Sequence, residues 1–150
     1  MTATDHGQGG GPLVLTRKAG EEIVLLVQPG TSEHINVCLT EVAHNRVKLA
    51  ITAPRSVGIF RSEIFQQSTG MELPKLPFGA LILSRKNKEE VILIPQDHSL
   101  TRAVVIGVSS VVSMKARLSF VADRSVSVFR KEVLERIEQD RRSGANITQL

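Results

Sequence analysis

The sequence predicts a mostly β protein built from two similar repeats, each with five short strands and a C-terminal helix. Its apolar residues are mainly Val, Leu and Ile, with five Phe and no Trp or Tyr, a composition that favours strands. Segments such as "RVKLAIT" alternate apolar and polar residues at the period of a half-buried strand. Similar segments also recur at a nearly constant spacing, which indicates a duplicated unit.

The duplication is visible in two pairs of segments. "LTRKAGEE" (15–22) matches "LSRKNKEE" (83–90) at an offset of 68, and "APRSVGIFRSEIF" (53–65) matches "ADRSVSVFRKEVL" (122–134) at an offset of 69. One residue is therefore inserted between the two matches, most simply in the turn around Gln96 to Arg102. A similarity that keeps apolar and charged positions over most of each half is an internal repeat.

Within the first repeat the strands are separated by turn residues in "QPGTSE", "AHN" and "AP". A short helix, "SEIFQQ", follows the fifth strand. Its counterpart, "RKEVLERIEQDRR", is longer and has Val133, Leu134 and Ile137 on one face, which we interpret as a packing stripe. The predicted strands of the first repeat are 13–17, 22–27, 34–42, 46–52 and 56–61.

Each repeat is too short to bury a large core alone, so we expect the two repeats to pack against each other. The segment "STGMELPKLPFG" contains two Pro and two Gly without periodicity and is predicted to be a linker. The predicted organisation is a disordered tail (1–11), a first repeat (12–67), a linker (68–79), a second repeat (80–142) and a C-terminal tail (143–150).

The charge balance of 19 Lys and Arg against 15 Asp and Glu gives a net charge of +4, which permits nucleic-acid binding. Cys38 is the only cysteine and lies in an apolar run, so we expect a small buried hydrophobe rather than a catalytic thiol. The N-terminal "MTATDHGQGGG" lacks the apolar segment of a signal peptide, and no apolar run reaches the length of a membrane span. These features predict a cytoplasmic protein.

No set of residues predicts an enzyme, a cofactor or a metal site. The paired carboxylates Glu21–Glu22 and Glu89–Glu90 are adjacent in sequence and should point apart, as solvated turn residues do. The histidines have no ligand spacing, and the Gly-rich N-terminus is not followed by a helix that could hold phosphate. Glu63 and Glu132 fall in the first turn of the predicted helices, where a carboxylate favours the positive helix end.

The first repeat resembles the carbon storage regulator family, CsrA/RsmA. The resemblance rests on "LVLTRKAGEEIVL", followed about 35 residues later by "AITAPRSVGIFRSEIFQ", and the second repeat fits the same pattern more loosely over 80–139. It implies an intertwined dimer, here fused into one chain that acts as a monomeric pseudo-dimer. It also implies binding of mRNA leaders at GGA-containing loops, so that ribosome access is blocked or mRNA stability is changed.

The family's RNA sites join the first strand of one unit to the fifth strand of the other. The resemblance therefore implies that Arg17 shares a site with Arg130, and Arg85 with Arg61. Arg suits such a site because its guanidinium fork matches the two acceptors of guanine. The RNA-binding residues implied in this way are Leu15, Arg17, Ile59, Arg61, Leu83, Arg85, Val128 and Arg130.

Two functions remain open at this point. The first is an RNA-binding translational regulator whose partners are mRNA and either a regulatory small RNA or a protein antagonist. The alternative is a protein-interaction module of the same fold that has lost RNA binding at one or both sites. The second repeat departs from the first at Lys88, which replaces Gly20 in a turn, and at Asp123, which replaces Pro54 before the fifth strand.

Overall fold

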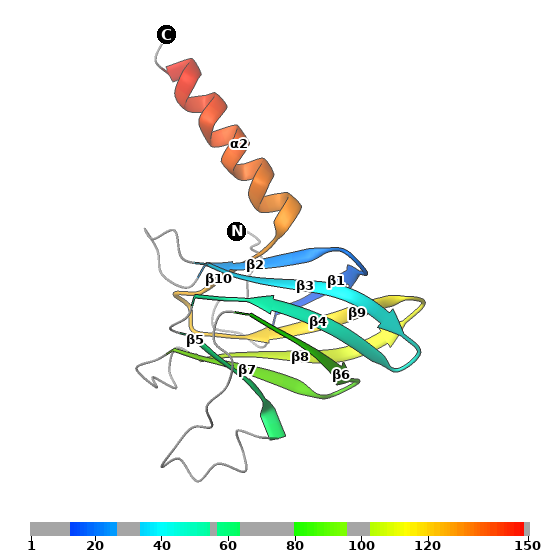
Figure 1. Cartoon of the computed structure of the whole chain (residues 1–150). Coiled ribbons are helices and arrows are strands. Elements are labelled where there is room, and N and C mark those ends of the chain that lie inside the picture. Colours follow the sequence, from blue (N-terminus) through cyan, green and yellow to red (C-terminus); the bar gives the residue numbers. More distant parts are fainter. Residues whose placement is uncertain (1–12, 27–33, 55–56, 64–79, 96–102, 149–150) are drawn as a thin grey trace.

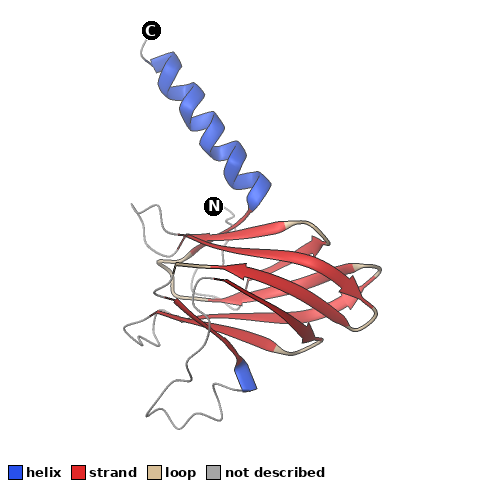
Figure 2. Ribbon diagram, in the orientation of Figure 1, coloured by secondary structure: helices blue, strands red, loops and turns tan. Residues whose placement is uncertain are grey.

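The computed structural model describes residues 13–26, 34–54, 57–63, 80–95 and 103–148. Figures 1 and 2 show two layered sheets from which a single long helix projects. The predicted N-terminal tail, the linker 68–79 and the turn 96–102 lie outside the described residues. The mostly β fold with two five-strand repeats is confirmed.

The strands of the first repeat begin and end close to the predicted positions. Apolar and polar residues alternate along them, so that one face of each is buried. Residues 62 and 63 are helical, and the rest of the predicted short helix lies outside the described residues. The strands are β1 (Leu13–Lys18), β2 (Glu22–Leu26), β3 (His34–Ala43), β4 (Arg46–Thr52) and β5 (Val57–Arg61).

The second repeat has the same order of elements and ends in the helix α2 (Lys131–Thr148), which runs beyond the predicted 130–142. Val133, Leu134 and Ile137 are half-buried near its start. From there α2 extends away from the sheets (Figure 1). The strands are β6 (Ala80–Lys86), β7 (Glu90–Pro95), β8 (Val104–Val112), β9 (Lys115–Val121) and β10 (Ser127–Arg130).

Each sheet contains strands of both repeats. One sheet has the order β1-β9-β8-β7-β5, and the other has the order β10-β2-β3-β4-β6. The first and fifth strands of each repeat thus form the edges of a sheet whose three central strands come from the other repeat. Because neither repeat holds its own outer strands, the two repeats are intertwined, as predicted.

The core lies between the sheets and is built from the inward-facing residues of both repeats. Leu25, Leu49 and Ile23 of the first repeat are fully buried, as are Val91 and Ala116 of the second. The inward positions carry almost only apolar side chains, which explains how two units too small to fold alone reach a stable core together.

The two repeats also share their irregularities. A β-bulge falls between Leu39 and Glu41 in β3 and at the matching place, between Val108 and Ser110, in β8. The offset is 68 through β7 and 69 from β8 onward, so the inserted residue lies between these strands. This agrees with the position inferred from the sequence.

The turn after the first strand keeps its geometry despite the change from Gly20 to Lys88. Gly20 has φ 88° and Lys88 has φ 73°, so a lysine adopts the left-handed conformation that favours glycine. The Gly20 amide donates to the Leu39 carbonyl over 2.6 Å, and the Lys88 amide donates to the Val108 carbonyl over 2.7 Å. The tight turn is therefore preserved at the cost of local strain.

Cys38 is not the fully buried hydrophobe predicted from its apolar run. It is half-buried, because the alternation of β3 places Val37 and Leu39 in the core and turns Cys38 to the opposite face. Partial burial, together with the nearby Glu22 carboxylate, raises the pKa of the Cys38 thiol. A raised pKa lowers the thiolate fraction and makes the side chain less reactive.

Candidate nucleic-acid interface

Arg17 on β1, an edge strand of one sheet, contacts Glu132 in the first turn of α2, directly after β10, an edge strand of the other sheet. Arg17 Nη1 donates to Glu132 Oε1 over 3.0 Å, and Nη2 donates to Oε2 over 2.8 Å. The same guanidinium donates to the backbone carbonyls of Thr16 and Glu22. A two-pronged ion pair therefore joins the first strand of repeat one to the start of α2 in repeat two.

The twin arrangement joins β6 to the segment after β5. Arg85 Nη1 and Nη2 each donate to a Glu63 carboxylate oxygen over 2.8 Å. Arg85 also donates to the Ser84 and Glu90 carbonyls. The molecule thus has two matching ends, each of which combines the first strand of one repeat with the fifth strand of the other. We call these ends the composite edges: one is formed by β1 and β10 and the other by β6 and β5.

The electrostatics of the two ends match as well. The hydrogen bonds from Arg17 lower the pKa of Glu132 to about 2, and those from Arg85 lower the pKa of Glu63 to about 2. The charge of Arg130 also lowers the pKa of Glu132, and the charge of Arg61 does so for Glu63. Each carboxylate therefore stays ionised and lies within electrostatic reach of two arginines.

The structure brings Arg17 to Glu132, two residues after Arg130, and Arg85 to Glu63, two residues after Arg61. Arg17 and Arg85 bind these carboxylates directly, whereas Arg130 and Arg61 act on them only through their charge. Their settings differ within each pair: Arg17 and Arg85 are 5% and 4% exposed, whereas Arg61 and Arg130 are half-buried at the ends of β5 and β10. Only the last two combine partial exposure with a guanidinium outside these two-pronged ion pairs.

The four apolar residues predicted to contact RNA belong to the core instead of the surface. Leu15, Ile59, Leu83 and Val128 are at most 4% exposed. Leu13, Leu15 and Arg17 alternate with exposed residues along β1, and the face that they share points inward. Among the described strands, β1, β5, β6 and β10 form the edges of the sheets, so one backbone edge of each pairs with no other described strand.

Asp123, the acid that replaces Pro54, forms a local turn. Its carboxylate accepts from the Ser125 amide at 3.0 Å and from the Ser125 hydroxyl at 2.6 Å, and these bonds lower the pKa of Asp123. The Val126 amide donates to the Asp123 carbonyl as the Val57 amide does to Pro54. The side chain of Asp123 thus replaces the ring of Pro54 as the device that fixes this turn.

Glu63 and Glu132 are the partners of the buried arginines. The sequence pattern predicts a role for these carboxylates only at the positive ends of the helices and does not predict the ion pairs. The signal that could have linked them to Arg17 and Arg85 was present, because both charges are kept in both repeats. The spacing could not reveal the pairing, since each ion pair connects different repeats.

Strand exchange between two copies of one unit, with arginines at both composite edges, defines a tandem β protein with two matching ends. The chain belongs to the CsrA family, described as a global regulator protein family, whose model matches residues 13–69 and 80–139. These two matches cover more than three quarters of the chain and correspond to the two repeats.

Several curated relatives are named "Translational regulator CsrA". The protein from Desulforapulum autotrophicum is 32% identical over 85 residues, which are 52% of this chain and 98% of that protein. The protein from Clostridium kluyveri is 38% identical over 55 residues, covering 37% of this chain and 67% of its own length. The protein from Borreliella burgdorferi is 43% identical over 54 residues, covering 36% of this chain and 59% of its own length. No solved structure gives a significant match.

Two further features bear on the kind of protein. Among the described residues, no three His, Cys, Asp or Glu side chains gather closely enough to hold a metal ion. In the same part of the chain, no helix combines the length and apolar character needed to cross a membrane.

Proposed function

We propose that the protein is an RNA-binding post-transcriptional regulator that binds GGA-containing mRNA leaders in single-stranded loops. Bound at a leader, it would exclude the ribosome or change the stability of the message, without any chemical step. The observation that carries the proposal is the composite edge, where a half-buried arginine lies beside the outer backbone edges of two edge strands. Unstacked bases offer their hydrogen-bonding edges to such groups.

Within each site we assign different tasks to the two arginines. Arg130 and Arg61 are the candidates for direct contact with guanine, because a guanidinium fork can pair with its O6 and N7 acceptors. Arg17 and Arg85 act as positioning residues, because their donors are occupied by Glu132 and Glu63. They fix the first strand of one repeat against the fifth strand of the other.

The proposal is tested by titrating the chain with a short GGA hairpin and with a CCA hairpin as control. We expect two RNAs per chain and weaker binding of the CCA hairpin by about 1–3 kcal/mol per lost guanine contact. Arg130→Ala and Arg61→Ala should each reduce the stoichiometry to one, and the double variant should bind neither RNA tightly. Equal affinity for both hairpins would instead leave a nonspecific basic surface or a protein-interaction module.

The crosswise grouping has its own test. Arg130→Ala combined with Arg17→Gln changes one composite edge and should leave one intact RNA site. Arg130→Ala combined with Arg85→Gln changes both edges, although both residues lie in repeat two, and should weaken every site. If the second variant keeps one site of full affinity and the first does not, each repeat binds RNA by itself and the grouping is wrong. Regulation by a small RNA or a protein antagonist would act by competing for these sites.

A further inference from the structure

Two patches of cations lie on the outer faces of the sheets, beside the composite edges. In the first, β1 pairs with β9 so that Lys18 is directly opposite Lys115, and Thr16 is directly opposite Arg117. All three cations are exposed, because the alternation of both strands turns them away from the core. We call Lys18, Lys115 and Arg117 the β1/β9 patch.

The second patch repeats the first around β6 and β4. Here Arg46 is directly opposite Lys86, and Lys48 is opposite Ser84. Arg46 and Lys86 are exposed, and Lys48 is half-buried. We call Arg46, Lys48 and Lys86 the β4/β6 patch.

Like charges directly opposite each other on neighbouring strands destabilise a sheet. This chain nevertheless places two cations in that arrangement twice, at equivalent positions. Within the described part of the chain, none of the six side chains takes part in a hydrogen bond or an ion pair. The facing pairs Lys18–Lys115 and Arg46–Lys86 thus repeat an unfavourable arrangement in both halves, and among the described residues neither pair forms an ion pair with a carboxylate, which indicates an anion supplied from outside.

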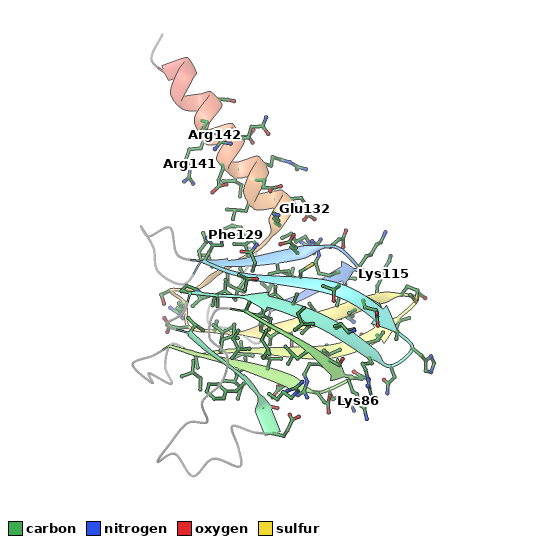
Figure 3. All side chains as sticks on the ribbon, in the orientation of Figure 1. Lys86, Lys115, Phe129, Glu132, Arg141 and Arg142 are labelled. Atoms are coloured by element: carbon green, nitrogen blue, oxygen red, sulfur yellow. The ribbon has the colours of Figure 1, made fainter. Side chains whose placement is uncertain are left out.

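The patches are continuous with the composite edges. Lys18 directly follows Arg17, whose guanidinium binds Glu132, two residues after Arg130. Lys86 directly follows Arg85, whose guanidinium binds Glu63, two residues after Arg61. An RNA chain that leaves the composite edge of β1 and β10 and crosses β1 therefore reaches the β1/β9 patch next. In Figure 3 the labelled Lys115 and Lys86 lie on the sheets, whereas Arg141 and Arg142 lie on the projecting α2.

We propose that each patch binds backbone phosphates of the RNA whose bases occupy the adjacent composite edge. The inference rests on the proposed function and extends it from base contact to the path of the flanking strand. The facing pair Lys18 and Lys115 would hold a phosphate between them, which removes their mutual repulsion on binding. Such contacts add affinity that depends on salt and not on base sequence.

The two patches differ in one nearby acid, and this difference allows the charge of a patch to be changed without removing any of its cations. Glu21 and Glu89 hold the turns by accepting from the Lys18 and Lys86 amides, and do so equally in both repeats. Glu41 lies opposite Lys48, whereas the equivalent residue opposite Arg117 is Ser110. Lys88, in the turn after β6, adds a further exposed cation near Lys86.

The main test compares two double variants with the same change in net charge. Lys115→Gln with Arg117→Gln removes two cations of the β1/β9 patch, and Arg141→Gln with Arg142→Gln removes two exposed cations of α2. Both are made in an Arg61→Ala background, so that binding is read from the Arg130 site alone. Affinity for a GGA hairpin with single-stranded flanks is measured as a function of salt.

We expect the patch variant to bind on the order of tenfold more weakly near 0.1 M salt, with a log–log salt slope shallower by about 1.4 for two lost phosphates. The fold-loss of affinity should be the same for GGA and CCA hairpins, because phosphate contacts carry no sequence information. The α2 variant should match its parent. Equal losses in the two variants would reduce the effect to net charge and overturn the proposal.

Two reciprocal single variants provide an independent test, because they keep every cation. Ser110→Glu places a carboxylate opposite Arg117 and should weaken the Arg130 site. Glu41→Ser, made in an Arg130→Ala background, should strengthen the Arg61 site. If neither variant changes binding while GGA is still preferred over CCA, the path over the patches is wrong and the proposed function stands. If the unmodified chain binds neither hairpin, both fail.

Discussion

Arg17 and Arg85 show how a charged side chain can belong to the interior. Each is almost completely buried, yet each guanidinium is satisfied by a carboxylate and by backbone carbonyls. A buried cation without such partners would be strongly destabilising. Their carboxylate partners, Glu132 and Glu63, are 53% and 48% exposed, so solvent screens part of each interaction.

We predict that Glu132→Gln and Glu63→Gln each lower the free energy of unfolding at pH 7 by about 1 kcal/mol, given this screening. Since the folded pKa of each carboxyl is depressed to about 2, its contribution is present above pH 4.5 and is lost as the pH falls toward 2. Urea unfolding at pH 7 and pH 3 should therefore show a smaller difference between wild type and variant at pH 3. A difference that grows on acidification would contradict the assignment.

The strained Lys88 gives a second prediction at this scale. Lys88→Gly should stabilise the fold by about 0.5–1 kcal/mol, because relief of the left-handed conformation exceeds the added entropy of the unfolded chain. The matched change Gly20→Lys should destabilise by a similar amount, since a Cβ at Gly20 meets no atom within 4 Å and only its φ is unfavourable. Thermal unfolding of both variants checks this. Destabilisation by Lys88→Gly would show that the lysine side chain makes a stabilising contact.

At the scale of the element, the first strand of each repeat serves two purposes. The inward faces of β1 and β6 complete the core of the sheets that they join, and their outer faces carry Lys18 and Lys86 of the patches. The first strands thus connect stability to the candidate RNA surface. The helix α2, by contrast, packs on β10 and β2 near its start and then leaves the sheets (Figure 1).

The facing cations on β1 and β9 predict a trade-off between stability and binding. Lys115→Glu replaces a repulsive cross-strand pair with an attractive one opposite Lys18, and should raise the free energy of unfolding by about 0.2–1 kcal/mol. The same change should weaken RNA binding. Urea unfolding and a binding titration on one preparation measure both effects. Lower stability in this variant would mean that the two lysines do not repel each other in the folded protein.

At the scale of the whole molecule, the exchange of outer strands makes the two repeats depend on each other. Without repeat two, β1 and β5 lose the strands with which they pair, and the central strands of repeat one lose β6 and β10. The pseudo-twofold arrangement also means that the intact chain already supplies both halves. We therefore expect it to behave in solution as a monomer of 16.4 kDa.

A half-chain ending after residue 67 tests this dependence. We expect it to be unfolded at low concentration and to form a homodimer at high concentration, because a second copy can supply the missing strands. Light scattering and circular dichroism over a concentration series measure both properties. A folded monomer of the half-chain would show that a repeat can hold its own outer strands, and would remove the physical basis for the crosswise sites.

Much of this protein follows from local sequence. The alternation of apolar residues fixed strand positions such as those of β3 and β4 to within a residue, because burial of one face is a local pattern. The matching segments established the repeat. The family resemblance also implied the crosswise grouping of Arg17 with Arg130.

Only the tertiary structure decided which face of each edge strand is buried and which charges meet. Period 2 groups Leu15 with Arg17 but does not tell whether that group points to solvent or to the other sheet. The pairing of Arg17 with Glu132, 115 residues away, and the opposition of Lys18 to Lys115 depend on strand register between repeats. Register is set when the two sheets assemble around one core, so no local pattern contains it.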